Sequence, residues 1–293
     1  MYGILNIQKP TGMTSRDVVN RIQPMVRPYK VGHAGTLDPL AEGVLVVCVG
    51  MATRLVRYIQ QMPKRYHAIF ELGCTSDTDD IDGDVKQLDN APIPSLEQVA
   101  ERIKPLVGSI QQRPPIYSAI RIQGQRAYKL ARAGKQFELQ PRAVSVYGIE
   151  IISYEYPQLV LDVSCGSGTY IRALGRDLAG SLDTSAVMTT LTRTTIGDFE
   201  LIDSLELGGL DADAMETQLL PLVRGVTELE KVELSADEIV QIHHGMRIDN
   251  RFRIQAQEFA GCDAEGQLMS ILTQCEADRI KPLRNFHAGD MAG

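Results

Sequence analysis

The amino-acid sequence predicts a mixed α/β fold in which a large domain precedes a small β-rich domain. Residues 44–72 have the pattern of a strand, a helix and a second strand, which is typical of a mixed sheet. Beyond about residue 230 the chain changes to short strand-like pieces. A chain of 293 residues has room for one sizeable core and a small appendage, because single cores stop growing at about 250 to 300 residues. We therefore expect domains at 1–230 and 231–293.

The first elements follow from capping residues and hydrophobic spacing. Thr14 and Asp17 have capping-box spacing and predict a short helix over 14–22. The apolar run 44–49, VLVVCV, predicts a buried strand. Residues 51–62 repeat apolar side chains at helical spacing, and apolar and polar side chains alternate from Tyr66 to Leu72, which predicts an amphipathic helix and then a strand.

The second half of the large domain contains a basic segment between regular elements. A Ser95/Gln98 capping box predicts a helix over 95–107. Residues 111–142 are rich in proline, glycine, tyrosine and basic side chains, and predict an exposed functional loop with a short helix at 127–133. Two strands are predicted at about 143–154 and 159–165. A further helix follows, whose apolar positions are Ile171, Leu174, Leu178 and Leu182.

The formal charge of −7 is unevenly distributed along the chain. Residues 1–70 carry +6, 71–100 carry −7, 101–145 carry +7 and 146–293 carry −13. The two basic blocks predict one basic face, and such a face governs attraction to phosphates more than the total charge does. The alternative is that both blocks are ordinary solvated surface.

Several classes of site are excluded by spacing. The five cysteines are scattered without a CxxC pair, so neither a disulfide framework nor a zinc site is indicated, and a cytoplasmic location is expected. The acidic segment 75–84 lacks the glutamate that closes a calcium loop. Ile171 occupies the third glycine position of a dinucleotide fingerprint. We expect no metal, no cofactor, no export signal and no membrane span.

The stretch from Gly32 to Pro39, GHAGTLDP, places Asp38 in a glycine-flanked turn that leads into the strand 44–49. Glycines permit backbone angles that other residues avoid, and a proline fixes the exit from the turn. This arrangement can display a reactive carboxylate at the rim of a strand. Taken alone, an aspartate before a proline more often only caps a turn.

The motif resembles that of the TruB-type tRNA pseudouridine synthases, GH(T/A)GxLDP(x)AxGxL, and it is matched through Leu45. Further matches to this family follow in order along the chain. They are Lys9-Pro10 with Gly12-Met13, Lys64-Arg65-Tyr66, Thr78 with Asp80 and Asp82-Gly83, Pro115 to Ala119, Ala127 to Gly134, Gly168 to Arg172, and Leu191 with Arg193-Thr194. The resemblance is strong to about residue 197 and covers nearly the whole chain.

The resemblance implies a pseudouridine synthase core that isomerises uridine 55 in the T loop of tRNA to pseudouridine without a cofactor or metal. Asp38 would act as the nucleophile, as carboxylates can. Attack at C1′ of the ribose, attack at C6 of the uracil and a glycal route all remain open. The uridine would first be flipped out of the folded loop, which costs on the order of a few kcal/mol.

The resemblance also assigns the other site residues. Tyr66 would stack on the flipped uracil and accept the C5 proton, and Arg172 would pair with Asp38 and keep it ionised. The implied substrate-binding residues are His33, which would fill the space left by the base, Lys9 near the site, Tyr170 at the uracil edge, Leu191 in the pocket wall, and Asp80 and Arg132 as outer charges. The structural alternatives are a turn histidine, a strand-edge tyrosine, surface ion pairs and core filling.

Residues 111–142 match the RNA-gripping insertion, or thumb, of the family, and residues 231–293 resemble a truncated PUA-like RNA-binding domain. We expect a monomer that binds the T arm of tRNA, with no obligate protein partner. One rival is a non-catalytic tRNA-folding protein, and a second is a pseudouridine synthase with a different RNA target. A third rival, an Asp-nucleophile hydrolase, would need a partner acid, and the pattern supplies Arg172 instead.

Overall fold

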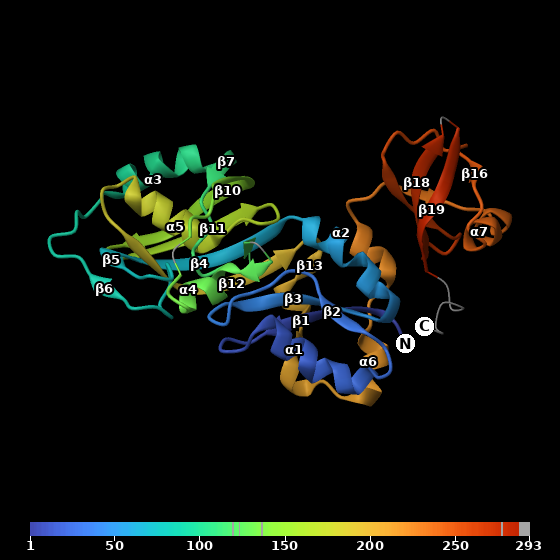
Figure 1. Cartoon of the computed structure of the whole chain (residues 1–293), viewed down its shortest axis with the longest axis horizontal. Helices are drawn as coiled ribbons and strands as arrows, with labels where there is room; N and C mark the ends of the chain where they lie inside the picture. The colour runs from blue at the N-terminus through green and yellow to red at the C-terminus, as the bar shows by residue number, and fades with distance from the viewer. Residues whose placement is uncertain (119, 123, 136, 277, 287–293) are drawn as a thin grey trace.

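The main feature of the computed structural model is a sheet of ten strands (Figure 1). The structure describes residues 1–118, 120–122, 124–135, 137–276 and 278–286. The strand order is β14-β1-β3-β12-β4-β11-β10-β7, with β2 beside β3 and β13 beside β12. These strands are β1 (Gly3–Lys9), β2 (Val31–His33), β3 (Glu42–Val49), β4 (Lys64–Leu72), β7 (Gly108–Gln112), β10 (Arg142–Glu155), β11 (Gln158–Cys165), β12 (Ala186–Ile196), β13 (Phe199–Glu200) and β14 (Leu205–Glu206).

Strand β12 joins the two halves of this sheet. It pairs antiparallel with β4 and, at Thr192 and Arg193, parallel with the beginning of β3. The loop that carries Asp38 enters β3 at this junction. The candidate nucleophile therefore lies where the half built from β1 and β3 meets the half built from β4, β11 and β10.

Helices cover both faces of the sheet (Figure 1). Apolar side chains are buried between these helices and the strands. Helices α1 (Ser15–Ile22) and α6 (Ala212–Gln218) pack on one face of β1 and β3, and the 3-10 segment η2 (Gly50–Leu55) with α2 (Val56–Gln61) packs on the other. Helices α3 (Leu96–Ile103) and α5 (Ile171–Gly180) cover the half built from β4, β10 and β11. This packing fixes the sheet on both sides of the junction.

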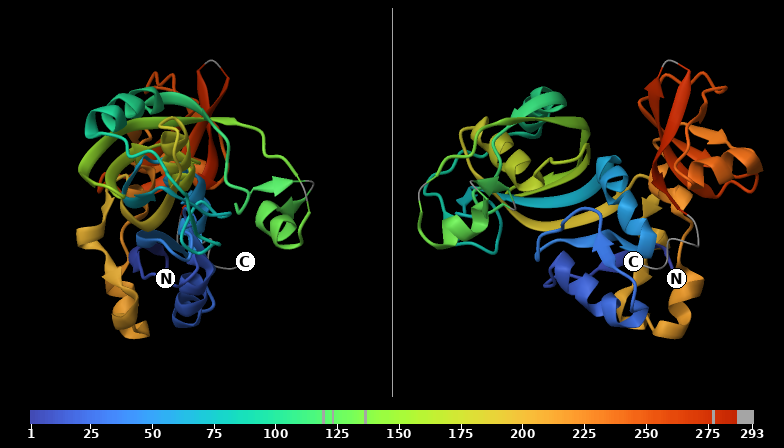
Figure 2. Two further views of the ribbon diagram at one scale, coloured as in Figure 1. Left: turned by 90° about the vertical axis from the view of Figure 1, so that its left-hand side faces the viewer. Right: turned by 45° about the vertical axis from the view of Figure 1, so that its right-hand side comes forward.

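The segment between β7 and β10 forms a separate projection, clearest in Figure 2. It contains the two-residue strands β8 (Arg121–Ile122) and β9 (Gln125–Arg126), followed by α4 (Ala127–Arg132). The remaining short elements of the core are η1 (Gln23–Val26), β5 (Cys74–Thr75), β6 (Lys86–Gln87), η3 (Lys104–Leu106), η4 (Leu201–Asp203), η5 (Leu207–Gly209) and η6 (Leu222–Val226).

The C-terminal part forms a second sheet of five strands in the order β15-β17-β18-β19-β16. Its elements are β15 (Lys231–Glu233), α7 (Ala236–His243), β16 (Ile248–Asp249), β17 (Glu258–Cys262), β18 (Leu268–Glu276) and β19 (Arg279–Asn285). Buried Ile271 and Phe286 share an apolar cluster with Leu55 and Ile59 of the core. Arg54 donates to the Asn285 carbonyl at 2.7 Å. The second sheet is thus packed against η2 and α2.

The predicted fold class, a mixed α/β core with a small C-terminal β domain, is confirmed. Both predicted capping boxes are present, at Thr14 with Asp17 and at Ser95 with Gln98. The helix predicted over 51–62 is divided into η2 and α2. The sequence reasoning did not predict β1 or the central strand β12. In the part of the chain that the structure describes, no helix is long and apolar enough to cross a membrane.

Candidate active site

The loop between β2 and β3 holds Asp38 in place through backbone contacts. The Ser15 hydroxyl, at the first turn of α1, accepts a hydrogen bond from the Leu37 amide at 2.8 Å. The Gly12 amide donates to the Pro39 carbonyl at 2.8 Å, and the Ala41 amide donates to the Asp38 carbonyl at 3.1 Å. The backbone on both sides of Asp38 is therefore tied to the N-terminal segment.

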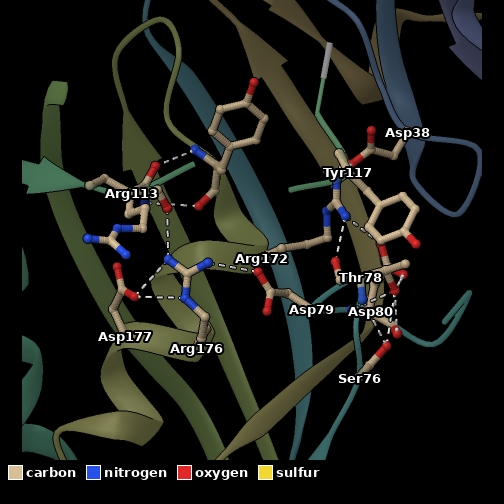
Figure 3. A network of polar contacts seen from close by, with 12 residues as sticks. Asp38, Ser76, Thr78, Asp79, Asp80, Arg113, Tyr117, Arg172, Arg176 and Asp177 are labelled. Carbon is tan, nitrogen blue, oxygen red and sulfur yellow. Dashed lines mark hydrogen bonds and ion pairs between the residues drawn. The ribbon is translucent and has the colours of Figure 1, made fainter. Parts of the chain in front are cut away.

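Arg172 connects two carboxylates that lie far apart in the sequence (Figure 3). Its Nη2 lies 2.9 Å from Oδ2 of Asp38, and its Nη1 lies 3.0 Å from Oδ2 of Asp80. The side chains of Arg172 and Asp80 are each only 5% exposed, whereas that of Asp38 is 39% exposed. A buried guanidinium thus pairs with one accessible carboxylate. An arginine can do this while it binds other groups, because it presents several donors in a rigid plane.

The same two terminal nitrogens of Arg172 also donate to backbone carbonyls from two other segments. Nη1 donates to the Thr78 carbonyl at 2.6 Å, and Nη2 donates to the Tyr117 carbonyl at 3.1 Å. Arg172 therefore links helix α5, the acidic segment 75–84 and the base of the projection between β7 and β10. Arg172 lies off the apolar positions of α5 but is buried, because these carbonyls and two carboxylates compensate its charge.

Asp80 is fixed by its own segment. The Thr78 hydroxyl donates to Oδ1 of Asp80 at 2.5 Å, and the Asp82 amide donates to the same oxygen at 3.1 Å. Burial raises the pKa of Asp80, and the hydrogen bond from Thr78 and the charge of Arg172 oppose that rise. The acidic segment thus supplies an anchor for Arg172.

A second arginine repeats this arrangement one turn later on α5. Arg176 lies 2.9 Å from the carboxylate of Asp79 and 2.9 Å from that of Asp177, and it donates to the Arg113 carbonyl at 2.8 Å (Figure 3). Burial raises the pKa of Asp79, while the charge of Arg176 opposes the rise. Arg172 and Arg176 together attach the acidic segment to the start of the projection.

Two of the predicted site residues, Tyr66 and Leu191, are buried near the Asp38 loop. Tyr66, Leu191 and Leu37, which precedes Asp38, belong to one buried cluster. Tyr66 is 8% exposed, and Leu191 is 6% exposed. Burial raises the pKa of the Tyr66 hydroxyl, and the charge and hydrogen bond of Arg193 oppose this rise. Tyr66 and Leu191 therefore share an apolar cluster with the residue that precedes Asp38.

Three further cations are buried around the junction. Lys9 and Lys64 are 0% and 5% exposed, and Arg193 is 1% exposed. The Lys9 ammonium donates to the carbonyls of Pro10 at 2.8 Å and Met13 at 2.6 Å. The Lys64 ammonium donates to the carbonyls of Gln60 at 2.5 Å and Met62 at 2.6 Å. Burial lowers the pKa of each lysine to about 8.

His33 and Tyr170 each lie at the end of a regular element. His33 ends β2, and burial lowers the pKa of its imidazole, which favours the neutral ring. Tyr170 precedes α5, and both its amide and its carbonyl bind the Gln112 side chain, at 2.8 and 3.0 Å. The Arg142 guanidinium lies 5.1 Å from the centre of the Tyr170 ring.

Arg132 lies in α4, and its side chain is outside the described part of the structure, as is Ala119. Among the predicted residues, direct contact joins Asp38, Arg172 and Asp80. The sequence reasoning assigned no role to Thr78, Arg176 or Arg193. The i, i+4 spacing of Arg172 and Arg176 on one helix is a signal that could have identified Arg176. Within the described residues, no cluster of three or more His, Cys, Asp or Glu side chains could hold a metal.

Comparisons with known proteins agree on one family. A model described as "TruB family pseudouridylate synthase (N terminal domain)" matches residues 23–171. The tRNA pseudouridine synthase B of Caldanaerobacter subterraneus subsp. tengcongensis is 38% identical over 285 residues, covering 97% of this chain and 99% of that protein. The protein of the same name from Rhodopirellula baltica is 38% identical over 261 residues, covering 84% and 75%.

Solved structures show the same fold. One chain of a crystal structure of a Cbf5-Nop10-Gar1 complex matches with a TM-score of 0.77 and 24% identity, covering 98% of this chain and 86% of that one. A chain of an archaeal box H/ACA sRNP Nop10-Cbf5 complex matches with a TM-score of 0.72 and 22% identity, covering 98% and 86%. The likeness extends over both sheets of the molecule.

Proposed function

Because this chain belongs to the TruB family of pseudouridylate synthases, we propose that it isomerises uridine 55 in the T loop of tRNA to pseudouridine, with Asp38 as the nucleophile. It is an isomerase of the tRNA pseudouridine synthase class. The observation that carries the proposal for the site is the accessible Asp38 carboxylate held 2.9 Å from the buried Arg172 guanidinium.

The isomerisation needs no external electrons or atoms. The N1–C1′ bond breaks, the uracil turns, a C5–C1′ bond forms, and the proton on C5 is replaced by one on N1. Asp38 attacks C1′ or C6, or assists a glycal route; each of these uses one ionised carboxylate. Arg172 favours the ionised form because an opposite charge at hydrogen-bond distance stabilises it.

The walls of the site suit a flipped uracil. Tyr66 and Leu191 offer an aromatic ring and an aliphatic surface in the cluster that contains Leu37, the residue before Asp38. Aromatic side chains stack on bases for about 1 to 3 kcal/mol each. In the proposed assignment Tyr66 accepts the C5 proton and Tyr170 contacts the uracil edge. The neutral ring of His33 fills the space that the base leaves. Lys9 and Asp80 support the site from behind, and Arg132 adds charge from the thumb.

The projection between β7 and β10 is proposed to bind the rest of the tRNA. The projection from Gln111 to Arg142 serves as the thumb, and its exposed Arg121 and Arg126 supply phosphate contacts. Such contacts position an RNA without reading its sequence. The domain boundary is proposed near residue 230, where the chain leaves the core and enters the second sheet.

The proposal is tested with purified protein and an unmodified tRNA transcript. Pseudouridine is mapped by carbodiimide adducts and primer extension, and the expected result is a new stop at position 55. A transcript with cytidine at that position is the matched control and should show no stop. A protein that binds and refolds the transcript without producing the stop would contradict catalysis. A stop only in a ribosomal RNA fragment would contradict the target.

A further inference from the structure

Arg193 is a buried cation with no carboxylate partner among the described residues. Its side chain is 1% exposed, and within the described ranges no acidic group lies at ion-pair distance from its guanidinium. The neighbouring buried groups Lys9 and Lys64 are cations as well, and Arg193 is one of the causes that lower the pKa of both. Burying an unpaired charge is costly, so the position calls for a compensating set of contacts.

The side chain of Arg193 finds those contacts on the segment that carries Asp38. Its Nε donates to the Val44 carbonyl at 2.7 Å, and its Nη2 donates to the Gly35 carbonyl at 3.1 Å. Gly35 precedes Asp38 and Val44 follows it. One guanidinium therefore clamps both ends of the loop.

The backbone of Arg193 is equally close to this loop. Gly43 pairs with Arg193 between β3 and β12 and has a φ of +99°. A Cβ at Gly43 would lie 2.3 Å from the Arg193 carbonyl oxygen, which no side chain could tolerate. The beginning of β3 thus lies so close to β12 that position 43 has no room for a side chain.

Arg193 also faces Tyr66. The two residues are direct partners in the antiparallel pairing of β12 with β4, a relation that brings the Cβ atoms to about 4.5 to 5.5 Å. The charge of Arg193 also acts on the Tyr66 hydroxyl, since it opposes the rise in the pKa of that group that burial causes. Asp38 and Tyr66, which come from different halves of the sheet, therefore share one rigid neighbour.

We propose that Arg193 is a positioning residue that fixes the Tyr66 hydroxyl relative to the Asp38 loop. It does not touch the uridine; it acts through Tyr66 and through the loop carbonyls. This inference rests on the proposed function, in which Asp38 and Tyr66 act on the same base. A purely structural role would stabilise the fold without coupling Arg193 to the hydroxyl of Tyr66. The two roles therefore differ in whether the loss of rate on replacing Arg193 depends on that hydroxyl.

The test is a double-mutant cycle of Arg193→Gln and Tyr66→Phe, read by the single-turnover rate of pseudouridine formation at saturating tRNA and by the Kd for tRNA. Arg193→Lys is added because it keeps the charge and loses the planar fork. Arg65→Gln is the matched control, since Arg65 is the neighbour of Tyr66 in β4 but is exposed and pairs with Thr195.

The expected result is a rate about 100-fold lower in Arg193→Gln, the size of loss that a small misplacement causes, with an unchanged Kd. Arg193→Lys recovers part of the rate, and Arg65→Gln has the wild-type rate. When Arg193→Gln is added to Tyr66→Phe, the rate falls by less than a further factor of about ten, because the contact between the two residues is already lost.

The inference would be overturned if Arg193→Gln lowered the rate by the same factor in the wild type and in Tyr66→Phe. A wild-type rate in the Arg193→Gln variant would overturn it as well. If Arg193→Gln does not fold, Arg193→Lys replaces it in the same cycle with the same criteria. A wild-type protein that forms no pseudouridine in tRNA would refute the proposed function itself, and the inference with it. The two failures can be distinguished, because the failure of the proposed function is seen with the wild-type protein alone.

Discussion

Asp38 and Asp80 bind the same guanidinium, at 2.9 and 3.0 Å, yet the Asp38 side chain is 39% exposed and that of Asp80 is 5% exposed. The buried carboxylate is held by Thr78 and the backbone, so it fixes Arg172 from behind. The exposed carboxylate keeps free space in front of it. This asymmetry separates an anchor from a reactive group, although both are aspartates on one arginine.

Removing Arg172 should leave Asp80 as an uncompensated buried charge. We expect Arg172→Gln to lower the free energy of unfolding by about 3 to 5 kcal/mol, the usual cost of breaking a buried pair. Adding Asp80→Asn should recover much of this loss, because the amide removes the unpaired charge. Chemical denaturation of the two single variants and the double variant measures the coupling. Additive losses would contradict the anchoring role of Asp80.

Helix α5 packs so closely on β4 that Gly175 has no room for a side chain. A Cβ there would lie 2.1 Å from Cε1 of Phe70, a ring that is 1% exposed. We expect Gly175→Ala to destabilise the protein by about 1 to 3 kcal/mol through overpacking. Gly180, at the end of the same helix, has open space around its Cβ position. Gly180→Ala is the control and should be neutral or slightly stabilising in thermal unfolding.

The stability contributed by Lys64 should depend on pH. Its folded pKa is about 8, below the usual value of 10.5, so the unfolded chain binds more protons between these two values. The free energy of unfolding of the wild type should therefore rise with pH over this window, relative to Lys64→Met. With about 1.4 kcal/mol per unit of pKa difference, the gain is on the order of 1 to 3 kcal/mol.

Denaturation of both proteins at pH 7 and pH 10 measures this difference, and titrating groups that do not interact with Lys64 cancel in the comparison. A difference that stays constant with pH would show that the Lys64 ammonium is not destabilised in the folded state.

The thumb arginines should control tRNA affinity and its salt dependence. Arg121 and Arg126 are cross-strand partners and both are exposed. Each substitution to Gln should weaken binding and reduce the slope of log K against log salt by about 1. The single-turnover rate at saturating tRNA should not change. Arg102 is an exposed arginine on α3, so Arg102→Gln is the control. If this variant reduced the slope as much as the thumb variants do, a specific role for the thumb would be contradicted.

The sequence predicted the elements that have local signals. Capping boxes at Thr14 and Ser95 and the apolar run at 44–49 gave helices and a strand close to those observed. The central strand β12 was not predicted, because Thr190, Thr192 and Thr194 alternate with Leu191 and Arg193 and hide the apolar pattern. Only the pairing with β3 and β4 makes this polar stretch a buried strand.

The site was predicted in part, for a similar reason. The glycine-flanked turn singled out Asp38, and the family resemblance added Arg172 and Asp80, which the structure joins. Local patterns could not show that Arg172 is buried, since its partners Asp80 and Tyr117 lie far away in the chain. They also could not show that Arg193 lies opposite Tyr66, because register between distant strands is set by the folded sheet.

The most direct test of the central claim is the single-turnover rate of pseudouridine formation at tRNA position 55 in Asp38→Asn. The amide keeps the size of the side chain and removes the nucleophilic charge. We expect wild-type affinity for the tRNA, a normally folded protein, and no detectable pseudouridine. A variant that forms pseudouridine within about tenfold of the wild-type rate would contradict the account, because a loss that small is not the loss of a nucleophile.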